Sequence, residues 1–171
     1  HIGVSIVHPI MLENGWEFRT DFSQCTGDQI LGKNSIFEVY LAADKNITSR
    51  ASVPVLWDVK QATIVSNESS EIIRMFNSAF EQISVNELDL YPRTLRTEID
   101  ELNAMIYDDV NNGVYKTGFA TSQKSYTESF TKLFECLEEL EQRLSINRFL
   151  LGDKISEACL LYTSPSPRDT G

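Results

Sequence analysis

The apolar and polar positions of this sequence follow two different periods, one in each half of the chain. In the first half the apolar residues form short runs rich in β-branched and aromatic residues, which are typical of strands. In the second half they recur at helical spacing over long segments. The pattern therefore predicts an α/β domain followed by an all-helical one. Strands are expected at 2–7, 53–57 and 63–65, a short helix at 35–43, a long irregular connection at 8–34, and a second helix capped by Asn67 that runs toward Phe80.

Two long amphipathic helices account for the second half. Leu95, Ile99, Leu102, Ile106 and neighbouring apolar residues make one stripe, which the sequence Asn-Asn-Gly at 111–113 interrupts or ends. Helices of this kind should pack together as the start of a bundle. The second helix should span about 122–144, and its inward-facing residues are expected to be Tyr126, Phe130, Leu133, Phe134, Leu137, Leu140 and Leu144.

The segment 82–92 is expected to be the linker between two domains, which would then span 1–81 and 93–158.

Composition excludes several classes of function. The chain has 171 residues, 42% of them hydrophobic, which is enough for a real core, yet no window is apolar enough to cross a membrane. Its net charge of −10 argues against nucleic acid and anionic membranes as partners. Two histidines cannot furnish a metal cluster, and three cysteines without a C-x-x-C fit a reducing cytoplasm.

The stretch from Val53 to Phe80 contains the candidate ligand site. Pro54 cannot donate to a ladder, and it pushes Val53 into an extended conformation that leaves its backbone N–H and C=O free to pair with an extended peptide. Glu68 and Ser69 fall in the first turn of the next helix, where unpaired N–H groups, the positive dipole end and a hydroxyl suit a carboxylate. The two features together predict a site for a short peptide.

This stretch resembles a known family. V-P-x-L followed by E-S at a helix start is similar to the thioredoxin-like half of glutathione transferases, and three longer motifs resemble the glutathionyl-hydroquinone reductases, or Xi-class glutathione transferases. The similarity covers roughly residues 1 to 158, and it implies a partial thioredoxin-like domain followed by part of a helical glutathione-transferase domain. The motifs are LENGW at 12–16, SNESSEIIRMFNSAF at 66–80 and IYDDVNNGVYKTGFATSQ at 106–123.

The resemblance assigns roles to individual residues. It implies a cis Val53–Pro54 bond beside the cysteinyl part of glutathione, and a γ-glutamyl end held at Glu68 and Ser69. From the sequence alone, Trp16 would be a core residue, Arg50 a solvated surface charge and Tyr115 a core tyrosine. In the family, the matching tyrosine of N-N-G-V-Y transfers a proton to the aromatic substrate, a role that suits a phenol. The implied glutathione contacts are Trp16, Arg50, Ala51, Ser52, Val53, Glu68 and Ser69.

The implied activity is the reduction of glutathionyl-hydroquinones. A cysteine thiolate attacks the sulfur of the conjugate, the hydroquinone leaves, and a second glutathione resolves the mixed disulfide. Glutathione is then a co-substrate, and neither a bound cofactor nor a metal is expected. The family also implies a cytoplasmic homodimer. The alternatives are a conventional glutathione transferase that conjugates electrophiles, which the motifs at 111–115 and 120–123 disfavour, and a non-catalytic glutathione-binding module.

The resemblance also predicts that the chain is a fragment. Family members place a strand, a cysteine loop and a helix before the start of this sequence, and neither Cys25 nor Cys136 has their C-P-W-A context. The chain is therefore expected to lack the nucleophile and to be inactive as it stands. Cys159 replaces an expected Asp, and the Ser-Pro repeats after it predict that 159–171 is not native to the family. Without the family's further helices, apolar helix faces should stay uncovered.

Overall fold

The computed structural model describes residues 2–80, 83 and 88–163. These residues form two compact units, one ending at Ile72 and the other beginning at Ile73, so the division falls inside a helix. Parts of the predicted linker at 82–92 and of the predicted tail at 159–171 lie outside the described residues. No helix of the described chain combines the length and the apolar character needed to cross a membrane.

The first unit contains the helix that was predicted at 35–43. Helix α1 spans Ile36–Ala43, and the hydroxyl of Ser35 caps it by accepting a hydrogen bond from the backbone N–H of Glu38. The side chain of Phe37 is 53% exposed, while that of Val39 is buried. A two-turn helix can bury only one narrow stripe, and here the i, i+3, i+4 set of Ile36, Val39 and Tyr40 occupies it.

A two-stranded antiparallel hairpin follows α1. Strand β1 spans Leu56–Asp58 and β2 spans Thr63–Ser66, with Leu56 opposite Ser66. The sequence placed the first strand too early, since 53–55 precede β1 and are not part of it. Because the strands are antiparallel, the residues that enter β1 and those that leave β2 lie at the same end of the hairpin.

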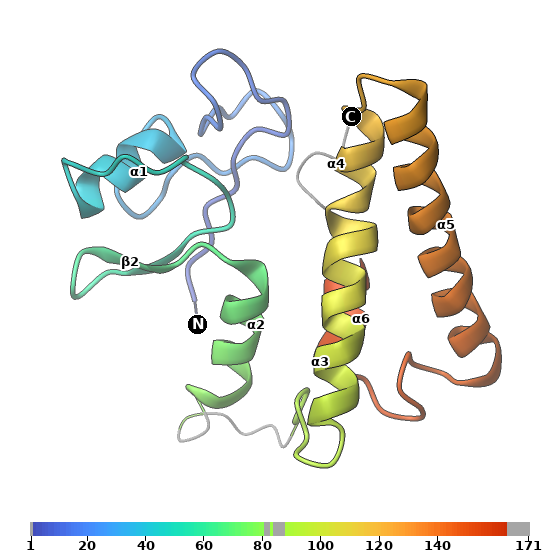
Figure 1. Cartoon of the computed structure of the whole chain (residues 1–171). Helices are drawn as coiled ribbons and strands as arrows, with labels where there is room; N and C mark the ends of the chain where they lie inside the picture. Colours follow the sequence, from blue (N-terminus) through green and yellow to red (C-terminus); the bar gives the residue numbers. More distant parts are fainter. Residues whose placement is uncertain (1, 81–82, 84–87, 164–171) are drawn as a thin grey trace. The chain divides into compact units, whose positions relative to one another are not determined.

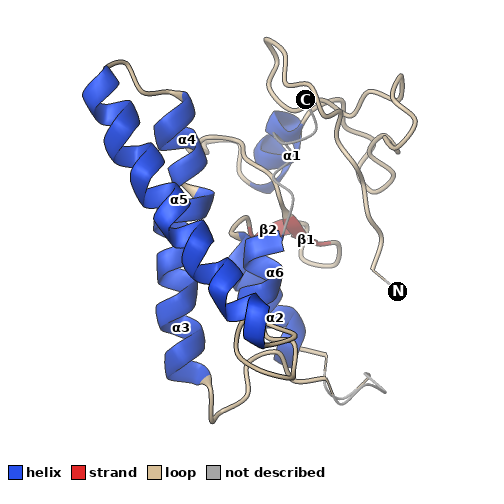
Figure 2. Ribbon diagram, turned by 90° about the vertical axis from the view of Figure 1, so that its right-hand side faces the viewer, coloured by secondary structure: helices blue, strands red, loops and turns tan. Residues whose placement is uncertain are grey.

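The strand predicted at 2–7 does not form. The backbone N–H of Ile6 donates to the hydroxyl of Thr26 at 2.8 Å instead of joining a ladder. A strand needs a neighbouring backbone, which short-range sequence patterns cannot supply. The irregular connection predicted at 8–34 is present and is crossed only by isolated bridges such as Glu17–Ser35 (Figure 2).

The second unit is helical, as predicted. Its helices after α2, which itself spans Ser69–Ser78, are α3 Arg96–Met105, the π-helix η1 Ile106–Asn111, α4 Gly113–Gly118, α5 Gln123–Ile146 and α6 Glu157–Thr163. The segments α3, η1 and α4 follow one another along one line, and α5 packs alongside them (Figure 1). The predicted interruption at 111–113 is confirmed as the change from π-helix to α4, a kind of irregularity that is often found at functional sites.

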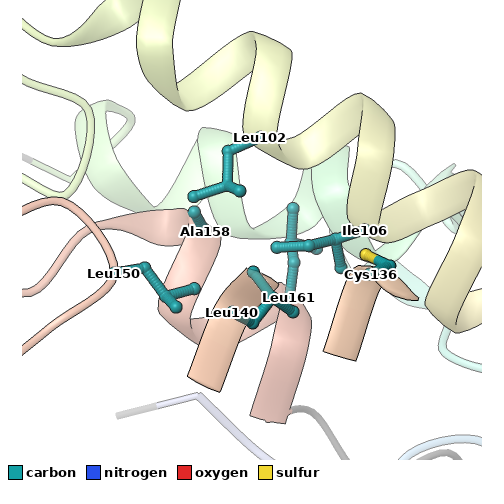
Figure 3. Close-up of a cluster of buried hydrophobic side chains, with 7 residues drawn as sticks. All are labelled: Leu102, Ile106, Cys136, Leu140, Leu150, Ala158 and Leu161. Carbon is teal, nitrogen blue, oxygen red and sulfur yellow. The ribbon is translucent and has the colours of Figure 1, made fainter. Parts of the chain in front are cut away.

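Buried side chains from α3, η1, α5 and α6 form the core of this unit (Figure 3). The core includes Leu161, which is 8% exposed, so α6 continues with a buried residue past the Ala158 at which the family resemblance ends. Ile99, buried completely, lies one turn before Leu102 on α3. The cluster consists of Leu102, Ile106, Cys136, Leu140, Leu150, Ala158 and Leu161.

The inward direction predicted for three aromatic residues of α5 is wrong. Tyr126, Phe130 and Phe134 are 42%, 39% and 51% exposed, and each ring contacts the next along the helix. The buried stripe consists of Leu133, Cys136 and Leu140. The sequence pattern merged two adjacent stripes into one, because the aromatic residues repeat at i, i+4, i+8 beside the core positions.

Candidate functional site

Three residues far apart in the sequence meet in a hydrogen-bonded cluster within the first unit. The amide nitrogen of Asn67 donates to the hydroxyl of Tyr40 at 2.9 Å and to Oγ of Ser52 at 3.0 Å. The Tyr40 hydroxyl in turn donates to the carbonyl of Ser52 at 3.1 Å and accepts from its backbone N–H at 3.3 Å. Ser52 directly precedes Val53, and Asn67 directly precedes Glu68. The two points predicted to bind a peptide are therefore joined through their neighbours.

The start of α2 differs from the prediction in its cap. Among the described hydrogen bonds, Oδ1 of Asn67 accepts none from the first turn of the helix, and the amide nitrogen of the same side chain donates to Tyr40 and Ser52. Instead the buried hydroxyl of Ser66 accepts from the N–H of Glu68 at 3.1 Å and donates to the carboxylate of Glu71 at 2.7 Å. The first intrahelical bond runs from the N–H of Ile72 to the carbonyl of Glu68.

This arrangement leaves a group of backbone donors at the helix start. Within the described part of the chain, the N–H groups of Ser69, Ser70 and Glu71 donate no hydrogen bond. Glu68 is exposed and Ser69 is half-buried, so the first turn is open to solvent. Unpaired N–H groups at the positive end of a helix form a suitable site for a carboxylate.

The backbone beside Pro54 provides the second part of the site. The Val53–Pro54 bond is cis, as predicted. Among the described residues, none forms a hydrogen bond with the N–H or C=O of Val53, while its half-buried side chain packs against the cluster of Trp16, Ile36 and Tyr40. Val53 thus has a fixed side chain and a backbone that is free to pair with an extended peptide.

The other residues predicted in the first unit occupy different surroundings. Trp16 is a core residue at 6% exposure, and its carbonyl accepts from the N–H of Ile36 at 2.8 Å. Ala51 packs against the same cluster. Arg50 is exposed, and no ion pair or hydrogen bond links it to a described residue. The structure therefore brings Trp16, Ala51 and Val53 together and leaves Arg50 at the surface.

Tyr115 belongs to the second unit, on the short helix α4 that follows the π-helix. Its ring is half-buried and stacks on Phe119, with 6.5 Å between ring centroids and an interplanar angle of 15°. The neighbouring residues of η1, α4 and α5 line a shallow depression of mixed charge, which includes Asp108, Lys116 and Lys132. The ammonium of Lys116 lies 2.6 Å from the Asp108 carboxylate and lowers the pKa of that carboxyl.

Comparison with known proteins gives close relatives. No protein-family model matches the chain. The glutathionyl-hydroquinone reductase YqjG of Escherichia coli is 54% identical over 157 residues, which cover 92% of this chain and 48% of that protein. Its glutathione-bound structure, described as a glutathione transferase homologue, gives a TM-score of 0.88 at 52% identity, covering 92% of this chain and 52% of that one. The Xi glutathione transferase of Phanerochaete chrysosporium gives 0.88 at 43% identity, covering 94% and 56%. The chain is a homologue of the Xi-class glutathione transferases.

The fold and the predicted resemblance agree with this homology. The chain has the glutathione-transferase fold over its matched length, with a thioredoxin-like first part and a helical second part. It spans about half the length of the curated relatives that it matches.

In this Xi-class homologue the buried cysteine Cys136 is not an activated thiolate. Burial, together with the nearby carboxylates of Asp109 and Glu139, raises the pKa of the Cys136 thiol. Cys25 lies in the loop region, where its thiol donates to the carbonyl of Val7 at 3.4 Å. A reactive cysteine needs a lowered pKa and an accessible sulfur, and Cys136 has neither.

Sequence reasoning missed the most buried charge in the second unit. The carboxylate of Glu157, whose side chain is 2% exposed, accepts hydrogen bonds from Nε of Arg74 at 2.7 Å and from the amide of Asn103 at 2.7 Å, and Arg74 Nη2 also contacts it. This carboxylate and Asp100 raise the pKa of the Arg74 guanidinium well above its usual value. The available signal was the acidic residue in the otherwise apolar segment at 155–161, since a buried charge requires a partner.

Proposed function

We propose that this chain binds glutathione and acts in the glutathione-dependent reduction of glutathionyl-hydroquinones. The observation that carries the proposal is the hydrogen-bonded link from Ser52 to Asn67, because it joins a free extended backbone at Val53 to the open first turn of α2. A tripeptide with a carboxylate at one end fits these two features. Two relatives, a glutathionyl-hydroquinone reductase and a homologue solved with bound glutathione, support the same substrate class.

In this proposal the residues of the first unit hold glutathione. The backbone of Val53 pairs with the cysteinyl part, and the first turn at Glu68 and Ser69 binds the α-carboxylate of the γ-glutamyl end. Trp16, Ala51 and Ser52 line or support the site, and Arg50 adds a positive charge near it. A charge-assisted hydrogen bond at the Ser69 hydroxyl would be one of the stronger contacts.

The redox step requires a cysteine thiolate that attacks the conjugate's sulfur. The carbon–sulfur bond breaks, the aromatic carbon takes a proton, and the hydroquinone leaves while the enzyme holds glutathione as a mixed disulfide. A second glutathione thiolate then releases glutathione disulfide. We assign the proton transfer to Tyr115. None of Cys25, Cys136 and Cys159 has the C-P-W-A context of the family's nucleophile, so we propose that this chain by itself binds glutathione without turnover.

Calorimetric titration of the 171-residue chain with glutathione tests the binding step. We expect measurable binding, and a loss of about tenfold for Ser69→Ala, since a charge-assisted hydrogen bond is worth about 1.5 kcal/mol. Ser70→Ala is the matched control, because it removes the same group from the next residue, which is exposed; its affinity should stay within about twofold. Equal losses in the two variants, or no binding by the unaltered chain, would contradict the assignment.

A turnover assay separates the proposed activity from its alternatives. Reduction of glutathionyl-menadiol is expected from the Escherichia coli relative, used as the positive control, and not from this chain alone. Turnover by this chain would show that one of its own cysteines attacks the conjugate. Conjugation of an electrophile to glutathione would instead favour a conventional transferase. We also propose that the activity is cytoplasmic and that the active form is a homodimer. Sedimentation measurements test the homodimer.

A further inference from the structure

We propose that Tyr40 and Asn67 are positioning residues for glutathione: they fix the distance between the backbone at Val53 and the first turn of α2. The inference rests on the proposed function and extends it to two residues that would not touch the ligand. Tyr40 is 2% exposed and lies in the middle of α1. Asn67 is half-buried directly before the helix start. Neither side chain is among the predicted contacts.

Three hydrogen bonds at the Tyr40 hydroxyl can form at the same time. A phenolic hydroxyl has one donor and two acceptor positions, and that of Tyr40 donates to the Ser52 carbonyl while accepting from the Asn67 amide and from the Ser52 N–H. The second amide hydrogen of Asn67 goes to Oγ of Ser52. Oγ of Ser52 also lies 3.3 Å from the Tyr40 hydroxyl. A polar cluster connected in this way favours one arrangement of its members, because other arrangements leave a poorly hydrated group unpaired.

Helix α1 holds this cluster in place. The Ser35 cap begins the helix, and the ring of Tyr40 packs with Trp16 and Ile36 in the core of the first unit. The segment before β1 and the segment after β2 are both tied to one hydroxyl on that helix. Loss of the hydroxyl should therefore let the Ser52–Val53 backbone move relative to the helix start, without removing any atom that would contact glutathione.

The expected consequence is a lower affinity through a smaller population of the competent arrangement. The apparent dissociation constant rises in inverse proportion to the fraction of molecules in that arrangement. A ligand that spans both features is sensitive to the distance between them. If only about a tenth of the molecules kept the competent distance, the apparent dissociation constant would rise about tenfold. The hydroxyl of Tyr40 and the amide of Asn67 belong to one cluster, hence their losses should not add.

Glutathione titrations of three variants test the inference. Tyr40→Phe removes only the hydroxyl, Asn67→Ala removes the amide from a more accessible position, and the double variant tests additivity. Ile36→Val is the matched control, since it lowers stability in the same core at a residue without a polar side chain. We expect the dissociation constant of each single variant for glutathione to be at least fivefold higher than that of this control. The dissociation constant of the double variant should exceed that of the weaker-binding single variant by less than fivefold.

Amide chemical shifts of the ligand-free proteins give a readout that general destabilisation would not reproduce. Tyr40→Phe should shift the backbone signals of Val53 and Glu68 together, whereas Ile36→Val should leave Glu68 unchanged. Affinities of both single variants within fivefold of the control, or additive losses, would overturn the positioning role while leaving glutathione binding intact. Absence of binding by the unaltered chain would overturn the proposed function itself, and with it this inference. Should Tyr40→Phe fail to fold, Asn67→Ala decides the question alone.

Discussion

At the scale of single residues, the second unit contains an ion pair between the buried carboxylate of Glu157 and the partly exposed guanidinium of Arg74. Glu157 is nearly inaccessible, and its carboxylate is bound by Arg74 and Asn103. Arg74 also lies over the ring of Tyr91, with 3.3 Å from the guanidinium carbon to the ring centroid. A buried pair adds little stability compared with apolar residues of the same shape, but removing one partner leaves a charge that is neither solvated nor neutralised.

Arg74→Ala should therefore be strongly destabilising. We expect a loss of about 3 kcal/mol in the free energy of unfolding, measured by urea denaturation, because the carboxylate of Glu157 would remain buried with only the Asn103 amide as its partner. Arg96→Ala is the matched control, since Arg96 contacts the same Tyr91 ring at 5.0 Å from the solvent-exposed side of α3. It should cost less than about 1 kcal/mol. Equal costs in the two variants would mean that Glu157 is not held by Arg74.

At the scale of the elements, α5 presents two stripes with different roles. Leu133, Cys136 and Leu140 are buried, whereas Tyr126, Phe130 and Phe134 form an exposed aromatic stripe whose rings stack at 5.7 Å and 4.3 Å between centroids. A helix of 24 residues derives most of its stability from the face that it buries. The exposed stripe should instead govern association with other molecules.

Substitutions on the two stripes of α5 should separate stability from association. Leu140→Ala should cost about 2–5 kcal/mol in unfolding free energy, because it opens a cavity beside Ile106 and Leu150 in the core. Phe134→Gln, at a position that is 51% exposed, should cost at most about 1.5 kcal/mol, the value of a lost aromatic pair. It should also reduce concentration-dependent association in light scattering. A larger loss for Phe134 than for Leu140 would show that the aromatic stripe is buried in solution.

At the scale of the whole molecule, each unit has its own core. The cluster around Trp16, Ile36 and Tyr40 lies in the first unit, and the cluster around Ile106 and Leu140 lies in the second. Both tryptophans, Trp16 and Trp57, belong to the first unit, while α3, α4, α5 and α6 belong to the second. Tryptophan fluorescence and far-ultraviolet circular dichroism therefore report mainly on different units.

The two signals should not follow a single transition. In urea, Leu140→Ala should lower the midpoint seen by circular dichroism more than the midpoint seen by fluorescence, because the substitution removes packing from the helical unit alone. Ile36→Ala, in the core of the first unit, should have the opposite effect and serves as the reciprocal control. Coincident midpoints in both variants would indicate that the units unfold as one cooperative structure.

Local patterns predicted much of the fold and part of the site. The period of apolar residues gave α1, the long helices and the break at 111–113, and the predicted helix starts at Ser35 and Ser122 are N-caps in the structure. The family resemblance gave the cis Val53–Pro54 bond. The strand at 2–7 and the Asn67 cap were wrong for one reason. In both cases a polar group bonds a residue that is distant in the sequence: the N–H of Ile6 donates to the hydroxyl of Thr26, and the amide nitrogen of Asn67 donates to the hydroxyl of Tyr40.

The sequence by itself determined the two kinds of structure, the family and the position of the cis proline before the hairpin, because these depend on side-chain periodicity, on longer motifs and on proline. Only the tertiary structure decided that Tyr40 joins Ser52 to Asn67 and that Arg74 meets Glu157. Those contacts span 12, 27 and 83 residues, and no local pattern specifies which distant polar group will satisfy a buried donor or charge. Packing makes that choice, since every polar group that folding removes from water must find its partner in the same arrangement that buries the apolar core.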